Sequence, residues 1–307
     1  MCVRHPATLA LFAALLLFAA LAGPATAERE RLGYGRLVVN DQFGDLRDRD
    51  RSGAYASSRV WGPTWRGRLP AEPGTLLELR IHGEIMTPRN LERPSADDRP
   101  YAGALSLGLH THFRRGAAEM AAGLDLVVTG PQTGLGTFQS RLHEALAAPV
   151  PSDRVLDDQI RDGLHPTIVT EAARTWPMDA GRLRPFVEAR LGAETLLRAG
   201  ADLTIGPVGA DELLVREAST GHRYRVVTSA ARGMSLVLGA DVAAVRSSVF
   251  LPADRGYDLR TRRRARIGVH WQGERRAIFY GLAWLDREFA RQDTGQLLGA
   301  LRLDIRF

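Results

Sequence analysis

The chain contains a single cysteine and no lysine, and its one long apolar run lies next to the amino terminus. The cysteine, Cys2, precedes that run, so the rest of the chain offers neither a disulfide nor a cysteine-based metal site. Downstream of the run, no segment approaches the ~20 apolar residues that a membrane-spanning helix needs. Without such a helix, only a closed β-barrel could cross a bilayer.

The first 27 residues have the pattern of a secretory signal peptide. Arg4 and His5 form a short basic start, residues 7–22 are apolar, and Ala25-Thr26-Ala27 offers small residues for cleavage. A single-pass anchor is disfavoured because the apolar run is too short to span a bilayer. We expect a signal peptide over residues 1–27, cleaved on export, and one domain over residues 28–307, since no repeat or linker divides it.

All 41 basic residues are arginines, and the net charge is +6. A genome that favours arginine codons is the simple explanation. The functional alternative is a phosphorylated lipid partner, because a guanidinium binds phosphate through two hydrogen bonds. Nucleic acid is not an expected partner, since the arginines alternate with apolar residues and the densest run, Arg262–Arg264, is short.

Apolar and charged residues alternate at the carboxyl terminus. Leu301, Leu303, Ile305 and Phe307 share one face of a strand, and Arg302, Asp304 and Arg306 share the other. Similar segments, with weaker ones among them, recur at residues 34–43, 54–65, 77–85, 101–113, 120–128, 164–176, 183–191, 194–206, 222–231, 234–242, 265–271 and 278–284. This pattern predicts about a dozen amphipathic strands of ~10 residues each.

A soluble β-sandwich would also bury one face of each strand. Two observations favour a membrane barrel instead. The faces opposite the apolar ones carry many charges, which a wet lumen tolerates and a packed core does not. Aromatic residues also recur near strand ends, as in an interfacial girdle. We predict an all-β protein, a transmembrane antiparallel barrel of about 12 strands in the outer membrane, with a short helix in an extracellular loop.

Residues 136–148 depart from the strand pattern. Their apolar residues have helical spacing and two prolines follow: Phe138, Leu142 and Leu146, then Pro149 and Pro151. Gln139 and His143 are four residues apart and so project from the same side of the expected helix. Imidazole is the side chain best suited to accept a proton near neutral pH. His143 is therefore a candidate general base, and a merely polar surface histidine is the alternative.

Carboxylates and amides gather at the end of the first expected strand and in the hairpin that follows, at Asn40, Asp41, Asp45, Asp48 and Asp50. Oxygen ligands of this kind suit Ca²⁺. The spacing is not that of an EF-hand, because the regular ligand positions and the closing glutamate are missing. The alternative is a solvated, charged turn whose acids are neutralised by the interspersed arginines.

Four motifs follow one another along the first half of the chain. They are Asn40-Asp41, Asp48-Arg49-x-x-Ser52, Asp98-Arg99-Pro100-Tyr101-Ala102-Gly103, and Gln139-x-x-x-His143 after Thr129-Gly130-Pro131. In this combination the chain resembles the LpxR family of outer-membrane lipid A 3′-O-deacylases. The resemblance covers roughly residues 34–176, and the remainder matches mainly as barrel strands.

The resemblance implies a twelve-stranded barrel with its active site between the wall and an extracellular helix. It implies Ca²⁺-dependent hydrolysis of the 3′-O-linked acyloxyacyl ester of lipid A by an activated water. The site residues it implies are His143 as general base, Gln139 as its neighbour on the helix, Asn40 and Asp41 at the metal and oxyanion site, Ser52 at a Thr/Ser position, and Arg99 as a phosphate contact.

The chain departs from the family in three places: near the helix histidine, at a Gly-Trp pair that Val155-Leu156 replaces, and in the first hairpin at Arg51 and Ala54. An acidic residue usually follows the helix histidine, and Pro149 stands there, with Glu144 and Asp153 as candidates for its place. Two alternative functions therefore remain open: a non-catalytic outer-membrane barrel, either a channel or a structural protein, and a phospholipase A. The expected partners are lipopolysaccharide as substrate, the surrounding outer-membrane lipid and the barrel-assembly machinery.

Overall fold

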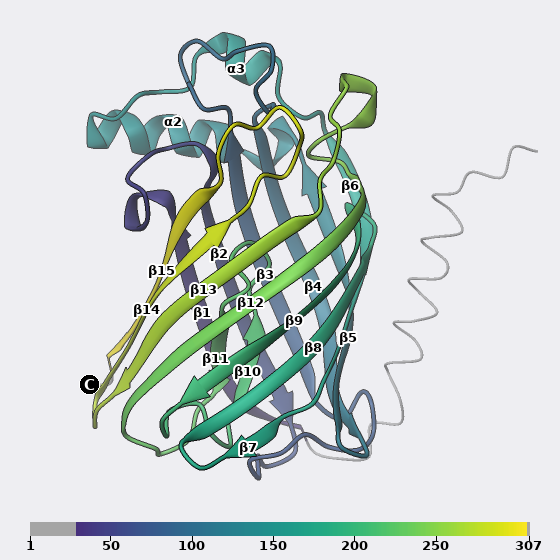
Figure 1. Ribbon diagram of the computed structural model, residues 1–307, viewed down its shortest axis with the longest axis vertical. Helices are drawn as coiled ribbons and strands as arrows, with labels where there is room; N and C mark the ends of the chain where they lie inside the picture. The colour runs from purple at the N-terminus through teal and green to yellow at the C-terminus, as the bar shows by residue number, and fades with distance from the viewer. Residues whose placement is uncertain (1–28, 306–307) are drawn as a thin grey trace, which may run out of the picture.

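A computed structural model describes residues 29–305, so the expected signal peptide and Phe307 lie outside the described residues. Twelve antiparallel strands form one closed sheet, as expected (Figure 1), because β1 pairs with β15 and β6 pairs with β8. These strands are β1 (Glu30–Asn40), β2 (Asp50–Gly62), β3 (Leu77–Thr87), β4 (Ala102–Arg115), β5 (Ala118–Thr129), β6 (Gly163–Ala173), β8 (Gly181–Leu191), β9 (Glu194–Ile205), β12 (Gly233–Ser248), β13 (Arg262–Gln272), β14 (Arg276–Leu285) and β15 (Gln296–Ile305). A short strand, β7 (Trp176–Met178), extends the sheet beside β8. In the described part of the chain, no helix is long and apolar enough to cross a membrane.

Side chains along each strand alternate between the lumen and the outer face. In β15, Leu301, Leu303 and Ile305 are exposed on the outside, whereas Arg302 is buried inside the barrel. In β13, Arg262, Arg264 and Arg266 are buried, whereas Arg263 and the apolar residues Ile267, Val269 and Trp271 are exposed. The charged faces seen in the sequence therefore line the interior, and the apolar faces form the surface that contacts lipid.

A separate hairpin of β10 (Leu213–Arg216) and β11 (Arg223–Val227) stands inside the barrel (Figure 1). In the described structure these two strands pair only with each other. The hairpin packs against inward-facing residues of β1 and β2 in one buried cluster that includes Leu213, Val215, Tyr224, Val226, Leu37 and Val60. We expected residues 222–231 to form a wall strand, and that expectation was wrong. A hairpin packed inside the lumen shows the same alternation of apolar and polar residues as a strand of the barrel wall, so the sequence pattern could not distinguish the two.

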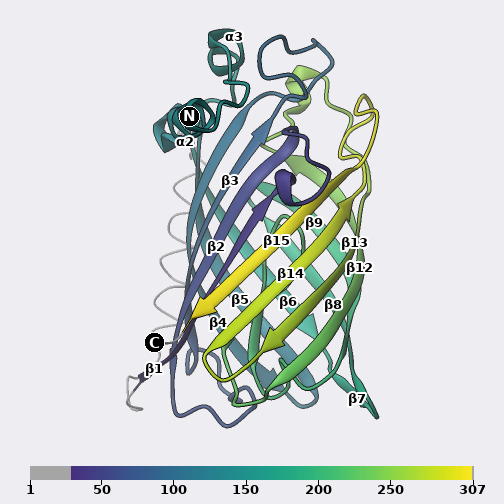
Figure 2. The same cartoon turned by 90° about the vertical axis from the view of Figure 1, so that its left-hand side faces the viewer.

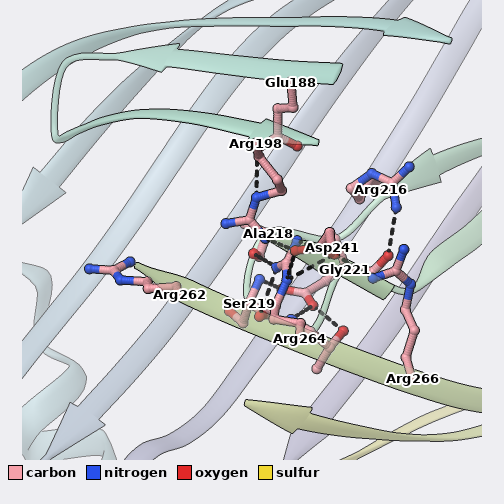
Figure 3. Close-up of polar contacts among 12 residues, drawn as sticks. Glu188, Arg198, Arg216, Ala218, Ser219, Gly221, Asp241, Arg262, Arg264 and Arg266 are labelled. Carbon is pink, nitrogen blue, oxygen red and sulfur yellow. Dashed lines mark hydrogen bonds and ion pairs between the residues drawn. The ribbon is translucent and has the colours of Figure 1, made fainter. Parts of the chain in front are cut away.

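The tip of this hairpin is bound by charged residues of the wall (Figure 3). Arg264 of β13 donates to the carbonyl oxygens of Ala218 at 2.7 Å and Ser219 at 3.0 Å. Arg216, on the hairpin, pairs with Asp202 of β9 at 2.9 Å. Arg198 pairs with Asp241 at the same distance, between two wall strands. Each of these three buried arginines thus has a carboxylate or carbonyl partner, as buried charges must have if they are not to be strongly destabilising.

The two ends of the barrel differ in their loops. Only two residues connect β4 to β5, whereas residues 130–162 connect β5 to β6 at the opposite end. That longer loop carries a 3₁₀ helix, η2 (Pro131–Thr133), and the helices α2 (Leu135–Leu146) and α3 (Asp153–Asp157). Further 3₁₀ helices, η1 (Asp41–Phe43) and η3 (Ala253–Arg255), lie at the same end. Short turns typically face the periplasm and long loops the outside, so this end is extracellular.

The helix predicted from residue 136 to residue 148 is α2, displaced by one or two residues. It ends at Leu146, and the next residue, Ala147, adopts a left-handed conformation with φ of 53°. This residue, rather than the prolines that follow, closes the helix, because its N–H and that of Ala148 bond back to the last turn. α3 was not expected from the sequence.

Candidate active site

A β-bulge near the extracellular end of β2 turns Ser52 toward the outer face. The pairing of β2 with β3 shifts register between Arg51 and Gly53. In such a bulge, two successive residues of one strand lie opposite a single residue of the partner strand, so the alternation between lumen-facing and outward-facing side chains shifts by one residue. Arg51 accordingly points into the lumen, where it binds Glu288 at 2.7 Å, and the Ser52 hydroxyl accepts a hydrogen bond from Gln139 of α2 at 3.3 Å.

Asn40 lies next to Ser52, at the end of β1. Its side-chain amide donates to the carbonyl oxygen of Ser52 at 3.1 Å. Its Oδ1 accepts from the N–H of Gln42 at 2.8 Å and so caps η1. Asn40 pairs with Gly53 across the strands, and a Cβ at Gly53 would approach the Asn40 amide to 3.2 Å. The structure thus brings Asn40, Ser52 and Gln139 into one continuous set of contacts.

The ring of His143 is held at both nitrogens. Nδ1 lies 2.7 Å from the carbonyl oxygen of Pro149. A carbonyl oxygen can only accept, so Nδ1 carries a proton and donates it. Nε2 lies 3.1 Å from Oδ2 of Asp48. Because Nδ1 is engaged by the Pro149 carbonyl, Nε2 is the nitrogen that faces the acidic residues of the β1–β2 loop.

This geometry answers the question raised by the acid missing from position 149. The backbone carbonyl of Pro149 orients the ring, a task for which any residue type suffices at that position. Glu144 and Asp153, the candidates from sequence, are both exposed. The carboxylate that meets the imidazole belongs to Asp48 instead. The sequence contained the signal, because Asp48 opens the second of the four motifs, but its role depends on a contact between distant segments.

Asp41 is only 1% exposed, and its environment disfavours a negative charge. Burial, together with the neighbouring carboxylates of Asp48 and Asp45, raises its pKa to about 8. Its Oδ2 accepts from the backbone N–H of Arg49 at 3.1 Å. Its Oδ1 has no partner among the described residues, nor has Oδ1 of Asp45 or of Asp48. These buried carboxylate oxygens are therefore free to accept a further bond.

A hard cation fits these free oxygens. Among residues 29–305, no three His, Cys, Asp or Glu side chains are already gathered into a metal site. Asp41 and Asp48 nevertheless offer oxygen atoms of the type that Ca²⁺ takes, and water, backbone or substrate oxygens could complete the set. Asn40 is less available, because its Oδ1 already accepts one hydrogen bond and has one lone pair left.

The β1–β2 loop that carries these acids is bound to the wall beneath it. Asp45 donates its N–H to the carbonyl of Leu297 at 3.1 Å, and Arg49 pairs with Asp45 at 2.8 Å. Leu46 and Asp50 have φ values of 60° and 55°, in the left-handed region that such side chains rarely adopt. Strained backbone of this kind persists where surrounding contacts enforce it, often at functional sites.

Arg99 lies behind this site rather than in it. Its side chain is 0% exposed, and Nη1 binds Glu288 at 2.8 Å. Glu288 also binds Arg51, so the two arginines are joined through one carboxylate under β2. Nε and Nη2 of Arg99 have no partner in the described structure. The contact of Arg99 with a phosphate therefore stays a prediction, and it would require a ligand group to enter the wall.

Tyr101 belongs to the third of the four motifs, but the sequence assigned it no role. Its side chain is almost fully buried, and its hydroxyl has no partner among the described residues. Burial raises its pKa, and the nearby carboxylate of Asp48 raises it further. A Cβ at Gly136 of α2 would lie 3.9 Å from this hydroxyl, so the ring supports the helix. Tyr101 is a neutral hydrogen-bond donor next to Asp48.

Comparison with known proteins identifies the family and the fold of the chain. A model of the family described as "Outer membrane protein LpxR" matches residues 11–307. The chain belongs to the LpxR family. Its fold is similar to that of LpxR from Salmonella typhimurium, with a TM-score of 0.73 at 18% identity over 90% of this chain and 100% of the other.

A second solved structure resembles this LpxR-family chain more weakly. It is the β domain of the Bordetella autotransporter BrkA, with a TM-score of 0.45 at 10% identity over 90% of this chain and 99% of the other. A comparison with curated protein sequences finds no match. The family match and the similarity to the fold of Salmonella LpxR support the outer-membrane barrel expected from the sequence.

Proposed function

We propose that the protein is a Ca²⁺-dependent lipid A deacylase that hydrolyses the 3′-O-linked acyloxyacyl ester, with His143 activating water. Membership of the LpxR family supports a deacylase role. The observation that carries the mechanism is the position of His143: its Nδ1 is fixed by the Pro149 carbonyl, and its Nε2 faces the acidic loop. The site lies on the outer face of the wall, where outer-leaflet lipid is found.

The chemistry requires one base and donors for the developing oxyanion. Nε2 of His143 takes a proton from water as the water oxygen attacks the ester carbonyl carbon, and it returns that proton to the departing alkoxide. Asp48 stabilises the imidazolium that forms between these steps. Ser52 is not a nucleophile in this scheme, because its hydroxyl contacts the Gln139 amide and not an imidazole.

Asp41 and Asp48 would hold the cation, and Asn40 and Gln139 would present amide N–H groups nearby. When bound, Ca²⁺ supplies a Lewis acid that stabilises negative charge on the carbonyl oxygen. Asn40 is fixed by Ser52 and by the Gln42 N–H, so its orientation costs little reorganisation during the reaction.

Lipid A from a host without such an enzyme, analysed by mass spectrometry with and without this chain, tests the proposal. We expect loss of mass equal to one acyloxyacyl group in the presence of Ca²⁺, and no loss after chelation with EDTA. Phospholipase A activity through the same residues would instead release fatty acid from glycerophospholipid. Glycerophospholipid products without any change in lipid A would overturn the assignment of substrate.

The affinity for Ca²⁺ should depend on pH through Asp41. Its pKa is raised from 3.8 to about 8, so the carboxyl is protonated in the folded protein over that range and must lose its proton to bind a cation. The affinity for Ca²⁺ should therefore rise by up to about tenfold per pH unit below pH 8.

The same proton affects folding. Without the cation, the free energy of unfolding falls as pH rises from 3.8 toward 8, because the unfolded chain releases this proton at a lower pH than the folded protein does.

Isothermal titration calorimetry in two buffers would measure both affinity and proton release. The variant Asp41→Asn should bind more weakly and without this dependence on pH. Asp153→Asn, a change at an exposed residue of α3, should behave like the unmodified protein. An affinity that is constant between pH 6 and 8 in the unmodified protein would contradict Asp41 as a ligand.

A further inference from the structure

α2 turns its polar residues toward the barrel and its large apolar residues away from it. Gln139 and His143 are buried, whereas Phe138, Leu142 and Leu146 are 57%, 43% and 68% exposed. A helix on a water-soluble protein buries its apolar stripe. The opposite arrangement indicates that the apolar stripe faces a non-aqueous medium.

The position of α2 shows which medium that is. Figure 2 places the helix outside the barrel, beside the extracellular ends of the strands. Leu135, at its start, lies on the outer face of β4, because a Cβ at Gly103 would be 3.0 Å from the Cβ of Leu135. Below Gly103 on the same face are Leu105 and Leu107, both exposed. The stripe therefore continues the lipid-facing surface of the wall.

The remaining exposed face of α2 is polar. Thr137, Arg141 and Glu144 are exposed and lie on the flank away from the apolar stripe. Gly136, between that flank and the buried face, lies against Tyr101 and Leu156 of α3. Tyr101 precedes Gly103 at the extracellular end of β4, so this flank is the one farther from the membrane. The helix is amphipathic in the manner of a segment lying in a bilayer interface.

A second apolar group lies on the other side of the site. In the β1–β2 loop, Phe43 is 40% and Leu46 is 72% exposed. The loop rests on the outer face of β15, since Phe43 would contact any side chain at Gly299 and its carbonyl accepts from the Tyr280 hydroxyl at 2.8 Å. β1 and β2, which carry Asn40 and Ser52, lie between β15 and the strands beside α2.

We propose that α2 and the β1–β2 loop form an acyl-chain platform, defined as Phe43, Leu46, Leu135, Phe138, Leu142 and Leu146. The platform is inserted in the outer leaflet and contacts the hydrocarbon chains of its lipid. This inference rests on the proposed function and extends it. Acyl chains held on both sides of Asn40 and Ser52 would place the ester groups of the lipid at the level of His143 in the membrane. The occupant is lipid hydrocarbon, since the surface is continuous with the lipid-facing wall and carries no charge.

Single-cysteine labelling tests the platform without reference to activity. In the full chain carrying Cys2→Ser, no other cysteine remains, so Leu142→Cys or Arg141→Cys can each be labelled with the fluorophore NBD. In vesicles that include lipid brominated along the acyl chains, the probe at 142 should be blue-shifted and quenched severalfold more than the probe at 141. The probe at 141 should instead be quenched by aqueous iodide. Equal iodide quenching at both positions would overturn the proposal.

A functional comparison separates this inference from the proposed activity. Leu142→Glu should lower the rate on lipid A in vesicles by about tenfold or more, whereas Arg141→Glu, which alters the polar flank, should change it little. Bromolipid quenching at position 142 in a protein that hydrolyses no lipid A would support the platform and defeat the deacylase. Hydrolysis of lipid A by a protein whose probe at position 142 is quenched by iodide would support the deacylase and defeat the platform.

Discussion

Replacing His143 with alanine should lower the rate of lipid A deacylation by about 10²- to 10⁴-fold, the usual contribution of a positioned general base. The substitution removes Nε2, which faces Asp48, and Nδ1, which binds the Pro149 carbonyl. The barrel should remain folded, because α2 is packed on the outside of the wall and contributes little to its core. Mass spectrometry of lipid A after reaction with purified protein in Ca²⁺ would give the rate.

Glu144→Ala provides the matched control, since Glu144 follows His143 on α2 but is exposed. It should retain full activity. Heat-modifiable gel migration would confirm that both variants form the barrel. Deacylation that survives in folded His143→Ala protein would show that another group activates water.

The variant Asp48→Asn should also deacylate lipid A more slowly, by about 10- to 100-fold. The substitution removes the charge that stabilises the imidazolium and one oxygen donor for the cation. Combined with His143→Ala, it should add little, since residues acting as one unit are not additive. A double variant whose loss equals the product of the two single losses would show that Asp48 and His143 act separately.

Removing the β10–β11 hairpin should open the filled lumen of the barrel into a pore. The unmodified protein should show no conductance steps in a planar bilayer, because Tyr224 and its apolar neighbours fill the lumen against β1 and β2. A variant in which a short Gly-Ser turn replaces residues 207–232 should show discrete steps. The wall should tolerate this change, since Arg266 keeps Asp202 and Asp241, and Arg198 keeps Asp241, as partners on wall strands.

This result would also decide between the functions left open by the sequence. Conductance by the unmodified protein, with no hydrolysis of lipid, would favour the channel. A shortened variant that migrates as a folded, heat-modifiable barrel and yet conducts no ions would show that the hairpin is not what closes the lumen.

The strand pattern was predictable because a membrane barrel imposes the same simple requirement on every residue of a wall strand. Lipid on one side and a polar lumen on the other require period-two alternation, so Leu301 and Arg302 reveal their faces without any partner. The hairpin at β10 and β11 obeys the same alternation for another reason, since it is packed inside the barrel. No local pattern distinguishes those two environments.

The site was only partly predictable for a similar reason. Gln139 and His143 share a helix face by spacing alone, and the structure places both on the buried side of α2. The bulge that turns Ser52 outward leaves no clear mark in the sequence, because it depends on the register between two strands. The carbonyl of Pro149 could not be recognised as a partner of His143 from residue types, since a backbone group has no sequence signature.

By itself, the sequence determined the fold class, the approximate number of wall strands and the resemblance to a family, because these depend on alternation and on short motifs. Only the tertiary structure decided what fills the lumen, which carboxylate meets the histidine, and that the apolar stripe of α2 faces outward. These features arise from contacts between segments far apart in the chain, such as Asp48 with His143. Such contacts are set by the closure of the barrel and not by any local preference of the residues involved.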